Sequence, residues 1–122
     1  MQTMSPRPRL CRLIWGTFVR GDVYELASPR GAKGHEQRGK RYGVIVQSDD
    51  LALSTVLVAP TSTSARPTSF RPEIDLRGRS TLVLAEQTMA LDPSRLGRRV
   101  GRLAWEEMRA LDAALALALG LD

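Results

Sequence analysis

The chain has 122 residues and a mass of 13.4 kDa, a size that suits one small globular domain and excludes a large multidomain enzyme. It carries 18 Lys and Arg against 13 Asp and Glu, a net charge of +5, which favours an anionic partner such as nucleic acid. Cys11 is the only cysteine and His35 the only histidine, which excludes a disulfide scaffold and a zinc site built from His and Cys.

The first 19 residues differ in composition from the rest of the chain. They are rich in Pro and Arg and end in a short apolar segment, Leu13–Val19, that lacks a cleavage site of small residues. We expect residues 1–19 to form an arm of unknown role and residues 20–122 to form the domain. The longest apolar block, Ala113–Leu119, is far shorter than the roughly 18 to 20 residues of a membrane span. The sequence thus predicts a cytoplasmic protein with no membrane partner.

From Arg20 onward the chain shows short runs rich in Val, Ile, Leu, Thr and Tyr, which favour strands. Two continuous apolar runs predict central strands, and a third run alternates apolar with charged residues and contains Pro72, which predicts an edge strand. A long exposed loop, Ala27–Lys40, has three glycines and four cations. The expected strands are Arg20–Leu26, Tyr42–Gln47, Thr55–Ala59, Phe70–Arg77, Thr81–Gln87 and Arg98–Leu103.

Two helical segments are predicted near the C-terminus. Asp92–Arg95 has Asp at an N-cap and Pro just inside, which indicates one helical turn. A longer helix is expected from Trp105 to a stop at Gly120, because four apolar residues recur there at helical spacing: Met108, Leu111, Leu115 and Leu119. We expect these residues and Trp105 to pack on the sheet rather than to form a partner groove. The fold class is therefore mainly β, a small antiparallel barrel or strongly bent sheet with a C-terminal α-helix.

Several segments, taken in order, resemble the MazF/PemK-like toxin family. In that family a strand beginning R-G-(D/E)-(V/I)-(Y/W) leads to a G-(S/H)-E-Q-x-G-x-R-P loop and a buried V-V/I-V strand. A later apolar strand of the family ends in (P/I)-T-(S/T). The resemblance covers nearly all of residues 20–121 and departs at Tyr42, where the family usually has Pro. The matching segments are Arg20–Tyr24, Gly34–Val46, Val58–Thr63, Leu84–Gln87, Leu96 and Val100–Leu103.

The resemblance implies a metal-independent endoribonuclease toxin, without a cofactor, on an SH3-like barrel. Such an enzyme cuts single-stranded RNA at a short sequence, works as a homodimer and is neutralised by a cognate antitoxin. The ribose 2′-OH attacks the adjacent phosphorus and leaves a 2′,3′-cyclic phosphate and a 5′-OH. Charge builds on the phosphoryl oxygens in this reaction, and a guanidinium is suited to stabilise it.

The same resemblance implies the roles of individual residues. Arg41 corresponds to the catalytic Arg of the family and Thr61 to its active-site Thr. For each the alternative is structural: an exposed charge beside a strand for Arg41, and a hydroxyl bonded to nearby backbone for Thr61. His35 is expected to have no catalytic part, since the family often has Ser there. The residues expected to bind RNA or support the site are Glu36, Gln37, Arg38, Lys40, Ser62 and Gln87.

Further cations in loops provide a possible track for an RNA backbone: Arg30, Lys33, Arg66, Arg71, Arg77 and Arg79. Two other functions remain open. A toxin of the same fold can bind DNA gyrase through an apolar, Trp-containing C-terminal end, but residues 118–122 lack that Trp. A basic RNA-binding module without turnover would bind with steep salt dependence and yield no cleaved product.

Overall fold

A computed structural model describes residues 18–27 and 41–121. The described part contains strands β1 (Asp22–Leu26), β2 (Arg41–Ile45), β3 (Val56–Ser62), β4 (Glu73–Leu76), β5 (Arg79–Val83), β6 (Met89–Leu91) and β7 (Leu96–Arg102). Two short 3-10 helices, η1 (Ala85–Gln87) and η2 (Pro93–Arg95), interrupt the later strands, and helix α2 (Trp105–Leu119) ends the fold. The arm up to residue 17 and most of the loop expected at Ala27–Lys40 lie outside the described residues.

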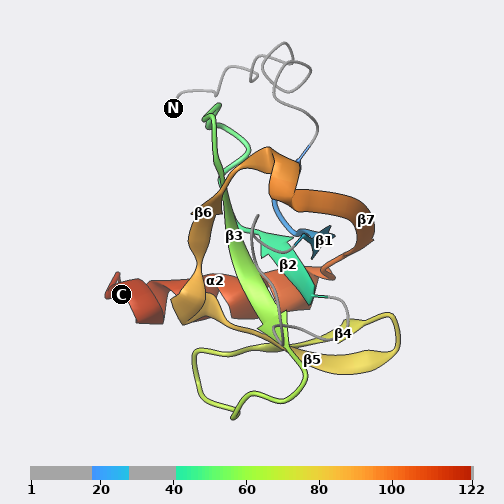
Figure 1. Cartoon of the computed structure of the whole chain (residues 1–122). Helices are drawn as coiled ribbons and strands as arrows, with labels where there is room; N and C mark the ends of the chain where they lie inside the picture. The colour runs from blue at the N-terminus through green and yellow to red at the C-terminus, as the bar shows by residue number, and fades with distance from the viewer. Residues whose placement is uncertain (1–17, 28–40, 122) are drawn as a thin grey trace.

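The strands form one continuous antiparallel arrangement in the order β4-β5-β3-β2-β1-β7, with β6 paired to β3 as well. Figure 1 shows the curvature of this sheet, with α2 crossing β2 and β3 and the β4–β5 hairpin near the end of β3. The molecule is a mainly β antiparallel half-barrel with one C-terminal helix, as the sequence predicted. None of the helices in the described residues combines the length and apolar character that spanning a membrane requires.

Strand β3 extends further than expected. The sequence predicted its end at Ala59, before Pro60, but the strand continues to Ser62 and pairs there with β5. Pro60 has no amide hydrogen to donate, and its carbonyl accepts a hydrogen bond from the Leu84 amide at 2.8 Å. The continuation matters because it adds Thr61 to an ordered strand.

The strand expected at Thr81–Gln87 is observed as β5, which begins two residues earlier, at Arg79, and ends four residues earlier. It ends at Val83, and η1 follows, so the seven residues from Val83 to Met89 lie opposite only four, Val58 to Thr61, on the facing strand. The Thr88 hydroxyl donates to the Ala85 carbonyl at 2.9 Å and closes the turn. Glu and Gln have weak strand propensity, and the small buried Ala85 packs in the same cluster as α2. After this turn the chain resumes as β6, a strand that the sequence analysis missed.

The other expected elements are confirmed with shifted ends. β4 is an edge strand whose Ile74 and Leu76 are buried, whereas Glu73 and Asp75 are exposed. η2 has Asp92 at its N-cap, with the carboxylate accepting from the Ser94 amide at 2.9 Å. The β4–β5 turn contains Arg77 at φ 54°, a left-handed conformation that is uncommon outside Gly and Asn.

Buried side chains form two clusters on opposite faces of the sheet. One contains Val44 and Ala59 with Leu111 and Ala114 of α2, and the other is centred on Ile45 and Val58. Because successive residues of a strand face opposite ways, β2 and β3 contribute to both clusters.

The apolar face of α2 is shorter than expected. Leu111 is fully buried, whereas Leu119, in the last turn of the helix, is 66% exposed. Trp105, expected in the core, is 68% exposed and has the Arg109 guanidinium 4.9 Å from its ring centroid. The helix does end at Gly120, as the sequence predicted, and Gly120 adopts a left-handed conformation.

The Arg20-Gly21-Asp22 triplet joins three elements. The Arg20 guanidinium contacts the Val46 carbonyl at 2.8 Å and Asp112 of α2 at 2.8 Å. Gly21 has φ 95°, and a Cβ there would lie 2.9 Å from the Met108 sulfur, so a side chain would obstruct the helix. Asp22 is buried beside β7. The triplet therefore anchors α2 and β7 to the start of β1.

Gly43 provides a test of packing in the centre of the sheet. A Cβ at Gly43 would lie 2.4 Å from Cγ1 of Val58. We expect Gly43→Ala to lower the free energy of unfolding by about 1–3 kcal/mol, the usual cost of overpacking a core. Chemical denaturation measures the change. Gly101→Ala is the control, since its Cβ would lie 3.7 Å from Leu76. Equal stabilities of the two variants would contradict the predicted clash.

Candidate functional site

Arg41 and Thr61 lie at the same corner of the sheet. Arg41 is the exposed first residue of β2 and faces Leu26 of β1. Thr61 lies near the end of β3, where the register Gly43↔Pro60 continues to Tyr42 opposite Thr61. The Thr61 hydroxyl donates to the Tyr42 carbonyl at 3.2 Å. This hydrogen bond crosses between strands and places the Thr61 oxygen directly beside the residue that follows Arg41.

The two side chains leave the sheet on opposite faces. Alternation puts Thr61 on the face of Tyr42, and Arg41 on the face of Ser62. At a strand end both sets of side chains reach the rim of the sheet, so the corner presents a guanidinium and hydroxyls around one edge. Within the described part of the chain, no ion pair engages the Arg41 guanidinium. Its donors can therefore face an anion.

Ser62 has a structural task at this corner. Its hydroxyl oxygen accepts from the Ser64 amide at 3.1 Å and from the Ala65 amide at 2.9 Å. These bonds form a turn directly after β3 and orient the chain that leaves it. Any contact between Ser62 and a ligand would be made by an oxygen already held in place.

Gln87 is exposed on η1, close along the chain to the residue that pairs with Thr61. Thr61 pairs with Val83, and the next residue, Leu84, is bonded to Pro60. The Gln87 side chain lies 3.5 Å from Glu86 Oε2. The fold thus brings η1 beside the end of β3. Four expected site residues, and His35 with them, lie outside the described residues: Glu36, Gln37, Arg38 and Lys40.

Glu86 is a feature of this region that sequence reasoning missed. Two nitrogens of the Arg71 guanidinium contact its Oε2, Nε at 3.0 Å and Nη2 at 2.6 Å. The third nitrogen of Arg71 donates to the Arg66 carbonyl at 3.0 Å, and the guanidinium also lies 5.7 Å from the centre of the Phe70 ring. Arg71, expected to be available to RNA, is instead held by Glu86. No local spacing rule links two residues 15 positions apart.

The Arg71 hydrogen bond lowers the pKa of Glu86 below its ordinary value, and Glu86 in turn raises the pKa of Arg71. The two side chains are 19% and 27% exposed, so solvent still weakens the pair, and its main effect is to fix the position of η1 relative to the chain before β4.

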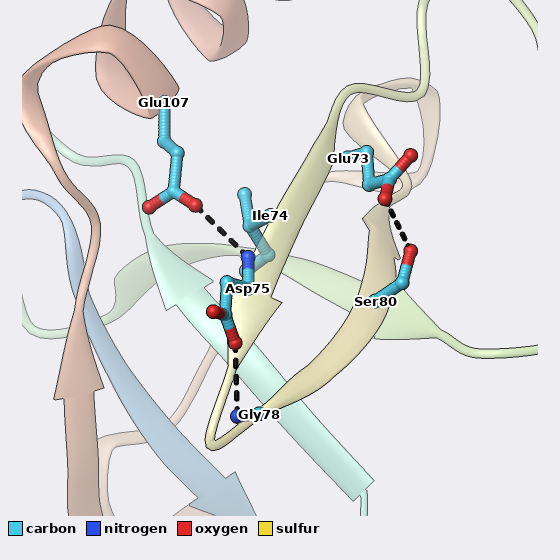
Figure 2. A pocket seen from close by; sticks show the side chains of 6 residues that line it. All are labelled: Glu73, Ile74, Asp75, Gly78, Ser80 and Glu107. Atoms are coloured by element: carbon cyan, nitrogen blue, oxygen red, sulfur yellow. Dashed lines mark hydrogen bonds between the residues drawn. The ribbon is translucent and has the colours of Figure 1, made fainter.

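An acidic hollow of about 380 Å³ lies elsewhere, between the β4–β5 hairpin and the start of α2. Figure 2 shows Glu107 accepting from the Asp75 amide and Asp75 accepting from the Gly78 amide, while Ser80 donates to Glu73. Each carboxylate is thus bonded to the protein, and the described residues contain no group of His, Cys, Asp or Glu arranged to hold a metal ion. The hydrogen bond from the Asp75 amide to Glu107 therefore links the β4–β5 hairpin to α2.

Comparison with known proteins places this fold. Residues 19–119 match the family model of the PemK-like, MazF-like toxins of type II toxin–antitoxin systems. The chain belongs to this family. It is 38% identical over 104 residues to Rv3098A of Mycobacterium tuberculosis, named as a candidate toxin, and this match covers 84% of the chain and 98% of the relative.

Two solved structures share the fold of this MazF-like toxin. The Mycobacterium tuberculosis toxin MazF-mt6 superposes with a TM-score of 0.68 at 22% identity, covering 83% of this chain and 98% of MazF-mt6. A mycobacterial endoribonuclease in complex with its cognate antitoxin gives 0.69 at 21% identity, covering 85% and 96%. The family resemblance drawn from the sequence is therefore confirmed.

The Arg71–Glu86 contact predicts a pH effect. A carboxyl whose pKa is lowered by folding stabilises the fold above its unfolded pKa, about 4.3 for Glu, and this contribution is lost as the pH falls through the lower folded value. We expect Arg71→Gln to raise the Glu86 pKa, measured by NMR titration of the carboxyl carbon. Asp92, whose pKa is lowered by the Ser94 amide, is the control and stays unchanged. A Glu86 titration identical in both proteins would contradict the assignment.

Proposed function

We propose that this toxin is a sequence-specific, metal-independent endoribonuclease that cleaves single-stranded RNA. The observation that carries the proposal is that the exposed Arg41 and the Thr61 hydroxyl, which is bonded to the carbonyl of the next residue, Tyr42, lie at one corner of the sheet in a chain that belongs to the MazF-like toxins. A relative in fold is described as an endoribonuclease, which supports the same reaction here.

In the proposed reaction the ribose 2′-OH attacks the adjacent phosphorus and the bond to the 5′ oxygen breaks. The products are a 2′,3′-cyclic phosphate and a 5′-OH. Arg41 is protonated, so it donates hydrogen bonds to the phosphoryl oxygens as their charge grows and, as the proposed acid, to the leaving 5′ oxygen. The 2′-OH loses its proton to solvent water as the new bond forms and the 5′ oxygen gains one as the old bond breaks, so that no proton is gained or lost overall. Thr61 donates to or accepts from the same phosphate, which requires its hydroxyl to exchange the Tyr42 carbonyl for substrate.

We assign the remaining expected residues to RNA binding and support of the site: Glu36, Gln37, Arg38, Lys40, Ser62 and Gln87. Aromatic residues are 5% of the chain, so base recognition would rest mainly on hydrogen bonds to base edges rather than on stacking. We further propose that residues 20–122 are the toxin domain, that residues 1–19 are an appended arm, and that the protein acts in the cytoplasm.

Removing the guanidinium tests the proposal. We expect Arg41→Ala to lower the cleavage rate about 10²- to 10³-fold, the usual loss for one preorganised donor to a developing oxyanion. The measurement uses a long defined RNA in excess EDTA, with mapping of the cut positions and chemical analysis of the new ends. Arg109→Ala, on α2, removes the same charge away from the corner and should cut normally.

Three outcomes separate the alternatives. Cuts that bear cyclic phosphate and 5′-OH and disappear in Arg41→Ala support the endoribonuclease. Salt-sensitive RNA binding with no product indicates a binding module, and no cleavage with inhibition of DNA gyrase indicates the other class of toxin. Thr61→Val, which keeps the shape and loses the hydroxyl, should lower the stability by only about 1 kcal/mol, for the lost hydrogen bond to Tyr42, and should still slow cleavage by the folded protein if Thr61 contacts the phosphate.

We also propose a homodimer neutralised by a cognate antitoxin, since a fold relative is described in complex with one. The exposed apolar residues at the end of α2, Leu117, Leu119 and Leu121, are available for a partner. Coexpression with the protein encoded next to this chain should give a stable complex that suppresses RNA cleavage, and light scattering of the toxin alone should give twice its 13.4 kDa mass. A monomer, or no complex, would contradict these assignments.

A further inference from the structure

The pair of strands β1 and β7 contains a buried carboxylate between two arginines. The side chain of Asp22 is only 6% exposed, and its two oxygens lie 3.2 Å from Nε of Arg99 and 3.3 Å from Nε of Arg102. The oxygen facing Arg102 accepts no hydrogen bond from the described residues, so the guanidinium charge is what balances it. We call Asp22, Arg99 and Arg102 the arginine clamp.

An irregularity in β7 creates this arrangement. In a regular strand, residues three positions apart point to opposite faces. The register shifts between Val23, which faces Gly101, and Tyr24, which faces Arg99. The resulting bulge turns Arg99 and Arg102 to the same face, on either side of Asp22. Bulges of this kind often re-aim side chains for a purpose beyond pairing.

The clamp has more positive charge than its carboxylate needs. One guanidinium neutralises Asp22, and the second leaves a net positive charge at the edge of the sheet. Both arginines contact Asp22 through Nε, whereas their Nη groups make no hydrogen bond or ion pair with another described residue. The side chains are 49% and 52% exposed. Each thus presents to solvent the end of the fork that binds a phosphate by two hydrogen bonds.

The surroundings favour a nucleic-acid strand as the ligand. β7 is at the end of the strand order, so a long polyanion can reach it without displacing another strand. Asp22 lies at one end of β1, and Leu26, which faces Arg41, lies at the other end, about 13 Å away for four residues of strand. Because Asp22 already orders both arginines, little side-chain freedom is lost when a phosphate binds.

We propose that the arginine clamp binds a backbone phosphate of single-stranded nucleic acid, outside the Arg41 corner. The choice of RNA as the natural ligand rests on the proposed function, whereas phosphate binding by the clamp does not. Its role is to hold a segment of the strand that flanks the cleaved bond. The clamp is therefore expected to affect affinity for long strands and not the chemistry at Arg41.

The experiment uses single-stranded DNA of mixed sequence, which lacks the 2′-OH and cannot be cleaved by the proposed route. Binding is measured by fluorescence anisotropy over a series of salt concentrations. We expect Arg102→Gln and Arg99→Gln each to weaken binding about fivefold at 0.1 M salt and to reduce the salt slope by about 0.7, the loss of one phosphate contact. Each single variant leaves Asp22 one arginine, so the fold is retained, which thermal unfolding checks.

Arg109→Gln on α2 is the matched control for charge and should keep the slope of the unchanged protein. A slope in the clamp variants equal to that of the control, with unchanged folding, overturns the proposal and leaves the clamp as a link between strands. The proposal is also overturned if Arg102→Gln weakens binding of poly-glutamate but leaves DNA binding unchanged. That result would assign the clamp to an acidic peptide. Failure of RNA cleavage by the unchanged protein counts against the proposed function alone.

Discussion

Backbone hydrogen bonds along both edges of β3 join the strands β2, β1 and β7 on one side to the strands β6, β5 and β4 on the other. One edge pairs with β2, which leads on to β1 and β7, and the other pairs with β6 and then with β5. The same strand ends at Thr61 and Ser62, so the hydrogen bonds that hold β3 in the sheet also set the position of the corner where Arg41 and Thr61 lie. A change that loosens β3 is therefore expected to disturb stability and the candidate site together.

The segments near the start of the domain that match the toxin family contain residues with structural contacts and residues exposed to solvent. Arg20, Gly21 and Asp22 are fixed by contacts to α2, to β2 and to β7, and their task is to close the fold around β1. Arg41, in the second half of the motif, is exposed and has no such partner among the described residues. A buried charge such as Asp22 is tolerated only with close compensation, which explains why β7 places arginines beside it.

Local patterns in the sequence were sufficient to predict those elements that are determined by residues close together in the chain. The helical spacing after Trp105, the stop at Gly120 and the alternation in β4 are confirmed, and a strand end was correctly expected beside Arg41. Features that depend on distant residues were not visible. Ala85 of η1 packs in the same cluster as residues of α2, Arg71 is held by Glu86, and Trp105 and Leu119, at the two ends of α2, are exposed. Each of these requires knowledge of which segments become neighbours.

The pairing of β1 with β7 has a consequence for the order of folding. Leu26 pairs with Leu96, seventy residues later in the chain, and Asp22 meets its arginines only when residue 102 has been made. Contacts between such distant segments form late, because a long loop must be closed first. During synthesis β1 can therefore complete its pairing with β7 only after residue 102 has left the ribosome, and until then the Asp22 carboxylate is hydrated rather than paired with arginine.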